Sequence, residues 1–375
     1  MQITGYRVLS TSVDRGRRIG DVNGVYPTTV SAVSILLIDT DVGITGVAAG
    51  GTTLIEGVWP AVEGEDPRSV TALYDRMLAH AFKAGHGGQL FGTIGAIDTA
   101  LWDIKAKAAG EPLWRLLGGR DRRVPGYASG LDFGLTDDEL FALYSTFAER
   151  GFTAAKLKGG LNLDDDLRRF AIIRDALRVA HPVLMLDANE CWNPKQAVRY
   201  LRRLEESVDL AWIEEPVRRW DTEGLATVGR SVRAAVATGE NLSGLEQFRP
   251  LIAGRALDIA QPGSGWGVSH ALRVAALAHG HDLLVSPVGF VAGPGAAVMA
   301  AIPNHVVSEV QGLTYPDGLL VDTTFDDGAF VLGDNPGNGF SIDESALEVP
   351  ESTAPTDEGP DVRPADAGLR LGLYG

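Results

Sequence analysis

A regular alternation of short apolar runs and amphipathic stretches between residues 124 and 311 constrains the fold more than any other feature. The apolar runs predict eight strands, at 124–129, 154–158, 182–187, 210–214, 234–240, 256–261, 282–287 and 306–311. Helical spacing between them predicts helices at 136–150, 164–179, 194–206, 244–253, 268–279 and 293–302. Eight strands that alternate with helices are typical of a (β/α)₈ barrel, here a slightly compact one. A doubly wound open sheet is the alternative, but no GxGxxG turn follows the first strand.

The segments on either side of this region follow different patterns. Two apolar runs within residues 30–49 flank a turn rich in Asp and Gly, which predicts a β-hairpin. Apolar residues then recur at steps of three and four within 67–83 and 90–109, which predicts two helices. Strands and turns are expected over 319–348, and this segment is expected to return toward the N-terminal α+β domain. Residues 350–367 are rich in Pro, Asp, Glu and Thr, and we expect a loosely held tail there.

The overall composition excludes several classes of function. The chain has 375 residues and a formal net charge of −16, which argues against binding to nucleic acid or to anionic membranes. No signal peptide is visible at the N-terminus, and no window approaches the ~18 apolar residues that a membrane-spanning helix needs. The single cysteine, Cys191, cannot form an intramolecular disulfide. We therefore expect a cytoplasmic protein that acts on a small molecule.

Three acidic residues end successive predicted strands. Asp187 ends the third strand, Glu214 ends the fourth 27 residues later, and Glu240 ends the fifth after a further 26 residues. Each interval is about one βα unit, so the three carboxylates are expected to lie side by side at the C-terminal mouth of the barrel, where barrel active sites lie. Carboxylates that converge in a dry site repel one another, and a hard cation such as Mg²⁺ relieves that repulsion. The spacing therefore predicts a Mg²⁺ site.

A pair of lysines lies on the strand before the first of these acids. Lys156 and Lys158 are two residues apart, so on a strand both side chains project from the same face, toward the predicted metal mouth. Two neighbouring ammonium groups and a nearby cation lower each lysine's pKa. A lysine with a lowered pKa can act as a general base near neutral pH. We therefore predict that this pair carries the proton-transfer chemistry.

These motifs resemble the mandelate racemase and muconate lactonizing branch of the enolase superfamily over nearly the whole chain. The resemblance rests on AIDTALWDIKAKAAGEPLWRLLGG at 96–119, followed in order by KLK, LDAN, WIEEP and GEN. It implies a modified (β/α)₇β barrel over 123–318. It also implies an N-terminal α+β capping domain over 1–122, completed by 319–375.

The resemblance further implies roles for the site residues. Asp187, Glu214 and Glu240 would bind Mg²⁺, and Lys158 would remove the proton next to the substrate carboxylate, as lysine bases do in this superfamily. The resulting enediolate would be stabilised by the metal. Lys156 would give electrostatic support and contact the carboxylate. Further contacts near the metal or the substrate would come from Asn189, Asn241 and Glu309.

One part of the family pattern is missing. The mandelate racemase group usually places an Asp–His dyad opposite the lysine, but Gly263 and Val288 stand at those two positions. The lysine that ends strand six in the muconate lactonizing group is absent as well. Of the seven histidines, only His270 and His86 are placed where they could supply a second acid or base. Because a racemase needs a proton-transfer group on each face of the enediolate, the missing dyad favours a reaction with one base.

The sequence therefore favours Mg²⁺-dependent dehydration of an acid sugar or a related hydroxy acid. Arg17, with Arg15 and Arg18, lies in the region of the family's specificity loop and is expected to meet a second carboxylate or a hydroxyl. Racemisation or epimerisation and lactone cycloisomerisation are the alternatives within the superfamily. A barrel that binds metal and ligand without turnover is a further alternative. The resemblance also implies a homo-oligomer.

Overall fold

The computed structural model describes residues 1–347, and the predicted tail at 350–367 lies outside the described residues. The N-terminal part is built on an antiparallel sheet in the order β1–β4–β5. Its strands are β1 (Ile3–Asp14), β4 (Val30–Thr40) and β5 (Thr45–Ala49). The predicted hairpin is confirmed as β4 and β5, whereas β1 was not predicted. A second, two-stranded ribbon lies in the loop that follows β1, and it consists of β2 (Gly20–Asp21) and β3 (Gly24–Val25).

The middle of β4 is buried on both faces of this sheet. Leu36 and Ile38 belong to the main core with the helices, whereas Ile35 and Leu37 pack in a separate cluster with Phe340 from the C-terminal segment. Alternate side chains of a strand point to opposite faces. The continuous apolar run in β4 therefore reflects a strand that is covered on both sides.

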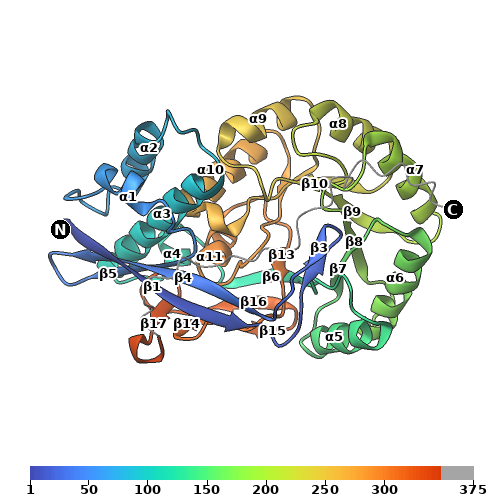
Figure 1. Cartoon of the computed structure of the whole chain (residues 1–375), viewed down its shortest axis with the longest axis horizontal. Helices are drawn as coiled ribbons and strands as arrows, with labels where there is room; N and C mark the ends of the chain where they lie inside the picture. Colours follow the sequence, from blue (N-terminus) through green and yellow to red (C-terminus); the bar gives the residue numbers. More distant parts are fainter. Residues whose placement is uncertain (348–375) are drawn as a thin grey trace.

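Helix α3 packs on one face of this sheet, α2 packs against α3, and short helical turns flank the two helices (Figure 1). Their bounds are α1 (Ile55–Val58), η1 (Trp59–Ala61), α2 (Val70–His80), α3 (Gly88–Ala109) and α4 (Leu113–Leu116). The two predicted helices are confirmed as α2 and α3. Helix α3 lies between the sheet and the barrel and approaches the barrel closely. A Cβ added to Gly95 of this helix would lie only 2.9 Å from the backbone of Gly267. Close approach of this kind requires glycine.

Eight parallel strands form the barrel, and their order follows the sequence (Figure 1). They are β6 (Arg123–Ser129), β7 (Ala154–Lys158), β8 (Val183–Asp187), β9 (Leu210–Glu214), β10 (Ala235–Thr238), β11 (Ile259–Ala260), β12 (Leu284–Val285) and β13 (Ser308–Val310). Strand β13 pairs with β6, and a bridge between Val285 and His305 links β12 to the chain before β13. The barrel prediction is confirmed, although β11 and β12 are shorter at both ends than the predicted ranges 256–261 and 282–287.

The outer ring of the barrel consists of helices that follow the strands. They are α5 (Asp137–Glu149), α6 (Leu163–Leu177), α7 (Pro194–Leu204), α8 (Thr222–Ser231), α9 (Leu245–Ala253), η2 (Ser264–Trp266) with α10 (Val268–His279), and α11 (Pro294–Ala301). The six predicted helices are confirmed, and α8 is an addition. Its TEGLATVGRS sequence contains two glycines that weaken the helical signal, but the Asp221 side chain caps its first turn.

The C-terminal segment ties the two parts together. It contains β14 (Leu319–Val321), β15 (Thr323–Asp326), β16 (Ala329–Leu332), β17 (Phe340–Ile342) and η3 (Glu344–Ala346). Strands β14 and β17 lie against the N-terminal sheet, as expected, whereas β16 pairs antiparallel with β6 of the barrel. The domain limits at residues 122 and 318 stay a prediction. Within residues 1–347, no helix is both long enough and apolar enough to cross a bilayer.

Candidate active site

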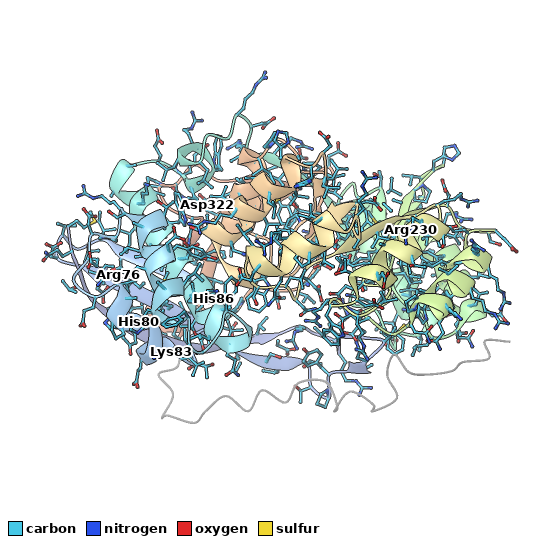
Figure 2. The ribbon with its side chains drawn as sticks, turned by 90° about the horizontal axis from the view of Figure 1, so that it is seen from above. Arg76, His80, Lys83, His86, Arg230 and Asp322 are labelled. Atoms are coloured by element: carbon cyan, nitrogen blue, oxygen red, sulfur yellow. The ribbon has the colours of Figure 1, made fainter. Side chains whose placement is uncertain are left out.

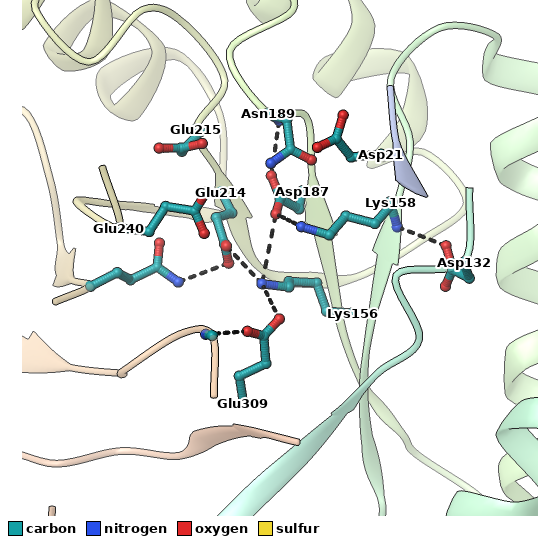
Figure 3. A network of polar contacts seen from close by, with 12 residues as sticks. Asp21, Asp132, Lys156, Lys158, Asp187, Asn189, Glu214, Glu215, Glu240 and Glu309 are labelled. Carbon is teal, nitrogen blue, oxygen red and sulfur yellow. Dashed lines mark hydrogen bonds and ion pairs between the residues drawn. The ribbon is translucent and has the colours of Figure 1, made fainter. Parts of the chain in front are cut away.

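The three predicted metal ligands lie together at the C-terminal mouth of the barrel (Figure 3). Asp187 and Glu214 are the last residues of β8 and β9 and are partners in the parallel ladder. Glu240 follows β10 after one intervening glycine. Parallel strands in register bring their carboxyl ends to one edge, so spacing along the chain becomes proximity in space. Together with Glu309 of β13, these side chains form what we call the acidic cluster: Asp187, Glu214, Glu240 and Glu309.

The backbone turns sharply directly after two of these strands. Asn189, Glu190 and Glu215 all have positive φ angles, of 39°, 61° and 42° respectively. Asparagine tolerates this left-handed conformation, but for the two glutamates it costs on the order of 1–2 kcal/mol each. The surrounding structure holds this strain immediately beside the carboxylates. Strained residues of this kind cluster at functional sites.

Both lysines of β7 point into the acidic cluster and are fully buried. The Lys156 Nζ atom lies 2.6 Å from Glu214 Oε1 and 3.1 Å from Glu309 Oε1. The Lys158 Nζ atom lies 2.5 Å from Asp187 Oδ2. The strand therefore brings two ammonium groups among the carboxylates, as the K-x-K spacing predicts.

The predicted lowering of the lysine pKa is wrong for the protein without a bound cation. Burial does oppose the charged form of Lys158, and Lys156 repels it, but the carboxylates of Asp187 and Glu240 outweigh both and raise its pKa. The pKa of Lys156 is likewise raised, since Glu214 and Glu309 outweigh the effect of burial. The sequence shows the neighbouring lysine, but not the carboxylates that the fold brings against each ammonium group: Glu214 and Glu309 against Lys156, and Asp187 against Lys158.

The two ammonium groups do not supply enough positive charge to keep every carboxylate of the acidic cluster ionised at neutral pH. Burial, together with repulsion from Asp187, raises the pKa of Glu214 to about 8, and the Glu240 pKa is raised for the same reasons. Burial also acts on Asp187, but the two lysines overcome it and its pKa is lowered. A buried carboxyl whose pKa approaches neutrality lacks sufficient counter-charge. The cluster is therefore electrostatically suited to one more cation.

The donor set at this mouth fits Mg²⁺, which prefers carboxylate oxygens and retains water or substrate oxygens. Asp187, Glu214 and Glu240 supply oxygen donors only. In the arrangement of residues 1–347, no three acidic, histidine or cysteine side chains converge closely enough to form a finished metal cage. The two ammonium groups hold the side chains of Asp187 and Glu214 instead. A cation that binds here would therefore compete with the lysines for the same oxygens.

Several residues that support the site were not predicted from the sequence. Gln261, just past β11, donates from Nε2 to Glu214 Oε2 at 2.7 Å. Asp132, past the end of β6, accepts a bond from the backbone N–H of Lys158 at 3.2 Å and pairs with Arg169 at 2.9 Å. Only its position three residues past strand one could have indicated Asp132, and no motif marks Gln261. Figure 3 places Asp21 of β2 beside Asn189 at the edge of the network.

The two asparagines predicted to contact the substrate, Asn189 and Asn241, both lie beside predicted metal ligands. The Asn189 backbone N–H donates to Asp187 Oδ1 at 2.9 Å. The Asn241 side chain donates to Glu240 Oε1 at 3.0 Å and to Glu215 Oε1 at 3.2 Å. Both asparagines therefore orient the carboxylates beside them. Their role as substrate contacts stays a prediction.

Of the other two predicted substrate contacts, Glu309 lies in the acidic cluster and Arg17 lies outside it. Glu309 lies in the acidic cluster, where its Oε2 atom accepts a bond from the Gly289 N–H at 2.6 Å. Arg17 instead donates to the Gly130 carbonyl, and burial lowers its pKa although Asp132 opposes this effect. No contact joins Arg17 to the acidic cluster among the described residues.

The two candidate histidines do not contact the acidic cluster in the described part of the chain. His270 is buried on α10, with its ring 5.2 Å from that of Phe91, and burial lowers its pKa to about 4. His86 lies at the edge of the N-terminal domain (Figure 2), where its Nδ1 is 2.9 Å from Glu246 Oε1. Their assignment as a second acid or base stays a prediction.

Comparison with known proteins identifies the family. Residues 140–346 match the enolase C-terminal domain-like family, and residues 25–118 match the N-terminal domain of mandelate racemase / muconate lactonizing enzyme. The chain belongs to the mandelate racemase and muconate lactonizing enzyme family. Family members characterised at about 30% identity to this chain are acid-sugar dehydratases and cycloisomerases.

Two relatives of known activity and two solved structures illustrate the likeness. The chain is 33% identical to a 3,6-anhydro-alpha-L-galactonate cycloisomerase of Streptomyces coelicolor, over 80% of this chain and 84% of that protein. It is 34% identical to an L-talarate/galactarate dehydratase of Salmonella typhimurium, over 76% of this chain and 71% of the relative.

A Streptomyces coelicolor racemase with bound magnesium superposes with a TM-score of 0.84 at 28% identity, over 92% of this chain and all of that one (100%). An L-talarate dehydratase from a Polaromonas species, in complex with Mg and L-glucarate, superposes with a TM-score of 0.82 at 29% identity. This match covers 92% of this chain and 97% of the dehydratase. These solved relatives therefore bind magnesium, and the dehydratase also binds a small carboxylate sugar acid.

Proposed function

We propose that this family member removes the proton next to the carboxylate of an acid sugar or related hydroxy acid and then eliminates a hydroxyl group. The observation that carries the proposal is the burial of two β7 ammonium groups in direct contact with carboxylates at the barrel mouth. A buried, hydrogen-bonded arrangement of this kind is pre-organised for proton transfer.

Asp187, Glu214 and Glu240 are the residues that would hold Mg²⁺. When bound, the cation supplies positive charge that stabilises an enediolate and neutralises part of the acidic cluster. Asn241 and Gln261 hold Glu240 and Glu214 in place through their amide groups. Amides in such positions fix the orientation of carboxylate ligands.

Lys158 is the proposed base. Its ammonium group is held by Asp187, and partial neutralisation of that carboxylate would lower the pKa of the lysine toward the range that a base requires. Lys156, which bridges Glu214 and Glu309, would hold the substrate carboxylate and the negative charge that develops on it. Lys158 would then return its proton to the departing hydroxyl on the same face.

The positions expected to face the lysines from the other side of the site also fit a reaction that uses a single base. Gly263 and Val288 bridge each other at the ends of strands six and seven, and neither side chain can transfer a proton. We infer that the chain lacks the Asp–His dyad of the racemase group. Racemisation or epimerisation is therefore less favoured than dehydration. Lactone cycloisomerisation is the second candidate, and the relative from Streptomyces coelicolor with that activity favours it.

Deuterium exchange tests the proposal. The protein with Mg²⁺ is incubated in D₂O with a panel of acid sugars and their lactones, and NMR follows uptake of deuterium at the α-carbon and formation of a 2-keto-3-deoxy product. We expect either signal with at least one acid, and its loss in Lys158→Ala. Undiminished exchange in that variant would exclude Lys158 as the base. Measured Mg²⁺ binding without exchange on any compound would favour a barrel that binds ligands without turnover.

A further inference from the structure

The main chain of Glu240 is held differently from that of the other two predicted metal ligands. Asp187 and Glu214 end β8 and β9 and are partners in the parallel ladder, so backbone hydrogen bonds fix both of them. Strand β10 ends at Thr238, and Gly239 follows it with a φ angle of 134°. Glu240 therefore lies in a turn beyond the ladder, and other contacts have to set its position.

The indole ring of Trp266 supplies such a contact. Trp266 lies in η2, in the loop that follows β11, and its Nε1–H group donates to the main-chain carbonyl of Glu240 at 2.5 Å. This N–H is the only hydrogen-bonding group of an indole ring. The Asn241 side chain donates to the Glu240 carboxylate at 3.0 Å. Trp266 therefore holds the main chain of Glu240, whereas Asn241 orients its carboxylate.

Helix α3 of the N-terminal part holds Trp266 from the other side. The Phe91 ring lies 5.7 Å from the Trp266 ring, and a Cβ added to Gly92 would meet the indole at 3.8 Å. The Asp98 carboxylate accepts bonds from the Ser269 backbone N–H at 2.7 Å and from its hydroxyl at 2.6 Å, which fixes the start of α10 directly after η2. The loop that contains Trp266 is therefore anchored to α3, and it can hold the Glu240 carbonyl in one place.

Gly263 leaves room for the bond between Trp266 and Glu240. Its φ angle is −66°, which any residue can adopt, so the backbone conformation does not require glycine there. The space does require it, because an added Cβ would lie 2.5 Å from the Glu240 carbonyl oxygen and 2.8 Å from Trp266 Nε1. A side chain at position 263 and the bond from Trp266 to Glu240 therefore exclude each other. Position 263 is also the one at which the family resemblance leads us to expect an aspartate.

We propose that Trp266 is a positioning residue of the metal site, which fixes the main chain of Glu240 through its indole N–H, and that position 263 is a glycine because this bond needs the space. Glu240 is a metal ligand in the proposed function, so this inference rests on that function. Loss of the bond releases Glu240 from its position without removing any oxygen donor, and the affinity for Mg²⁺ falls.

Calorimetric titration of Mg²⁺ into the full-length protein tests this inference. Trp266→Phe keeps an aromatic ring but removes the N–H donor. We expect its Kd for Mg²⁺ to rise by about tenfold, as is usual when a group that orients a metal ligand is lost. The matched control is Trp114→Phe, because the Trp114 Nε1–H also donates to a main-chain carbonyl, that of Gly333, at 3.0 Å. This control loses the same kind of bond outside the acidic cluster and should keep the wild-type Kd.

A second substitution disrupts the same bond while the indole ring is still present. The Cβ of Gly263→Ala has to displace the Glu240 carbonyl or the Trp266 indole, so the Kd for Mg²⁺ should rise by about tenfold here as well. The matched control is Gly265→Ala in the same loop. A Cβ at Gly265 meets no atom within 4 Å, and its φ angle is ordinary, so this variant should bind Mg²⁺ as the wild type does.

A wild-type Kd for Mg²⁺ in either Trp266→Phe or Gly263→Ala would overturn the proposal. An equal loss of affinity in Trp114→Phe or Gly265→Ala would also overturn it, because the affinity would then follow general destabilisation. If Trp266→Phe melts well below the wild type in EDTA, the comparison of Gly263→Ala with Gly265→Ala decides. Failure of the proposed function is read from a different measurement, the absence of α-proton exchange by the wild-type enzyme on every acid.

Discussion

Replacing Lys158 with methionine should destabilise the protein without Mg²⁺ and at the same time strengthen Mg²⁺ binding. The Lys158 Nζ atom lies 2.5 Å from Asp187 Oδ2, and both side chains are buried. Two ammonium groups face the four carboxylates of the acidic cluster, and the substitution removes one of them. Breaking a buried ion pair by removing one partner typically costs about 3–5 kcal/mol, since the remaining charge loses its partner.

This cost sets the size of the expected effect. For a chain of this kind, each kcal/mol lowers the melting temperature by roughly 2–4 °C, so Lys158→Met in chelator should melt roughly 6–20 °C below the wild type. Mg²⁺ no longer competes with the ammonium group in the variant, so the increase in melting temperature on adding Mg²⁺ should exceed that of the wild type. The assay is thermal unfolding in EDTA and across a Mg²⁺ titration, with α-proton exchange measured in parallel.

The control is Lys195→Met, because Lys195 is exposed on α7. This variant should keep the wild-type melting temperature in EDTA and the wild-type increase on adding Mg²⁺. Two results would refute the reasoning. An unchanged melting temperature of Lys158→Met in EDTA would mean that the buried ion pair does not stabilise the metal-free protein. A Mg²⁺-induced shift no larger than that of the wild type would mean that the lysine does not compete with the cation.

Three further predictions follow from the same structure. Glu240→Gln should weaken Mg²⁺ binding by at least about tenfold in calorimetry, because the site loses a charged oxygen donor, and unchanged affinity would exclude Glu240 as a ligand. Burial raises the pKa of Asp98 to about 7, so its stabilising contribution is present below pH 4 and is lost as the pH rises through 7; the free energy of unfolding of the wild type minus that of Asp98→Asn should therefore fall by about 1.4 kcal/mol per pH unit between pH 4 and 6.5. Burial lowers the pKa of His270 to about 4, so its contribution is present above pH 6.5 and is lost as the pH falls through 4; the free energy of unfolding of the wild type minus that of His270→Gln should therefore rise with pH over the same window. Denaturant titrations across pH measure both differences, and a difference that does not change with pH would contradict the corresponding assignment.

Much of the barrel and of the acidic cluster could be predicted from the sequence because both depend on local periodicity. A strand period of two places Lys156 and Lys158 on one face, and one βα unit separates successive carboxylates. The strand limits at 154–158 and 210–214 agree with β7 and β9. The predicted limits differ most from the structure where the periodic pattern of the sequence is least regular. Strands β11 and β12 are shorter than predicted, and α8, which was not predicted, contains two glycines.

Strand register and spacing along the chain are enough to predict which chemical groups meet at the barrel mouth. The charge state of these groups depends on contacts that form only in the folded chain. The tertiary structure placed Lys158 against Asp187, which raises the lysine pKa instead of lowering it, and it turned Arg17 toward the Gly130 carbonyl. It also created a cavity beside Glu309 from residues far apart in the chain. Burial and pairwise electrostatics depend on such non-local contacts, and no periodic pattern encodes them.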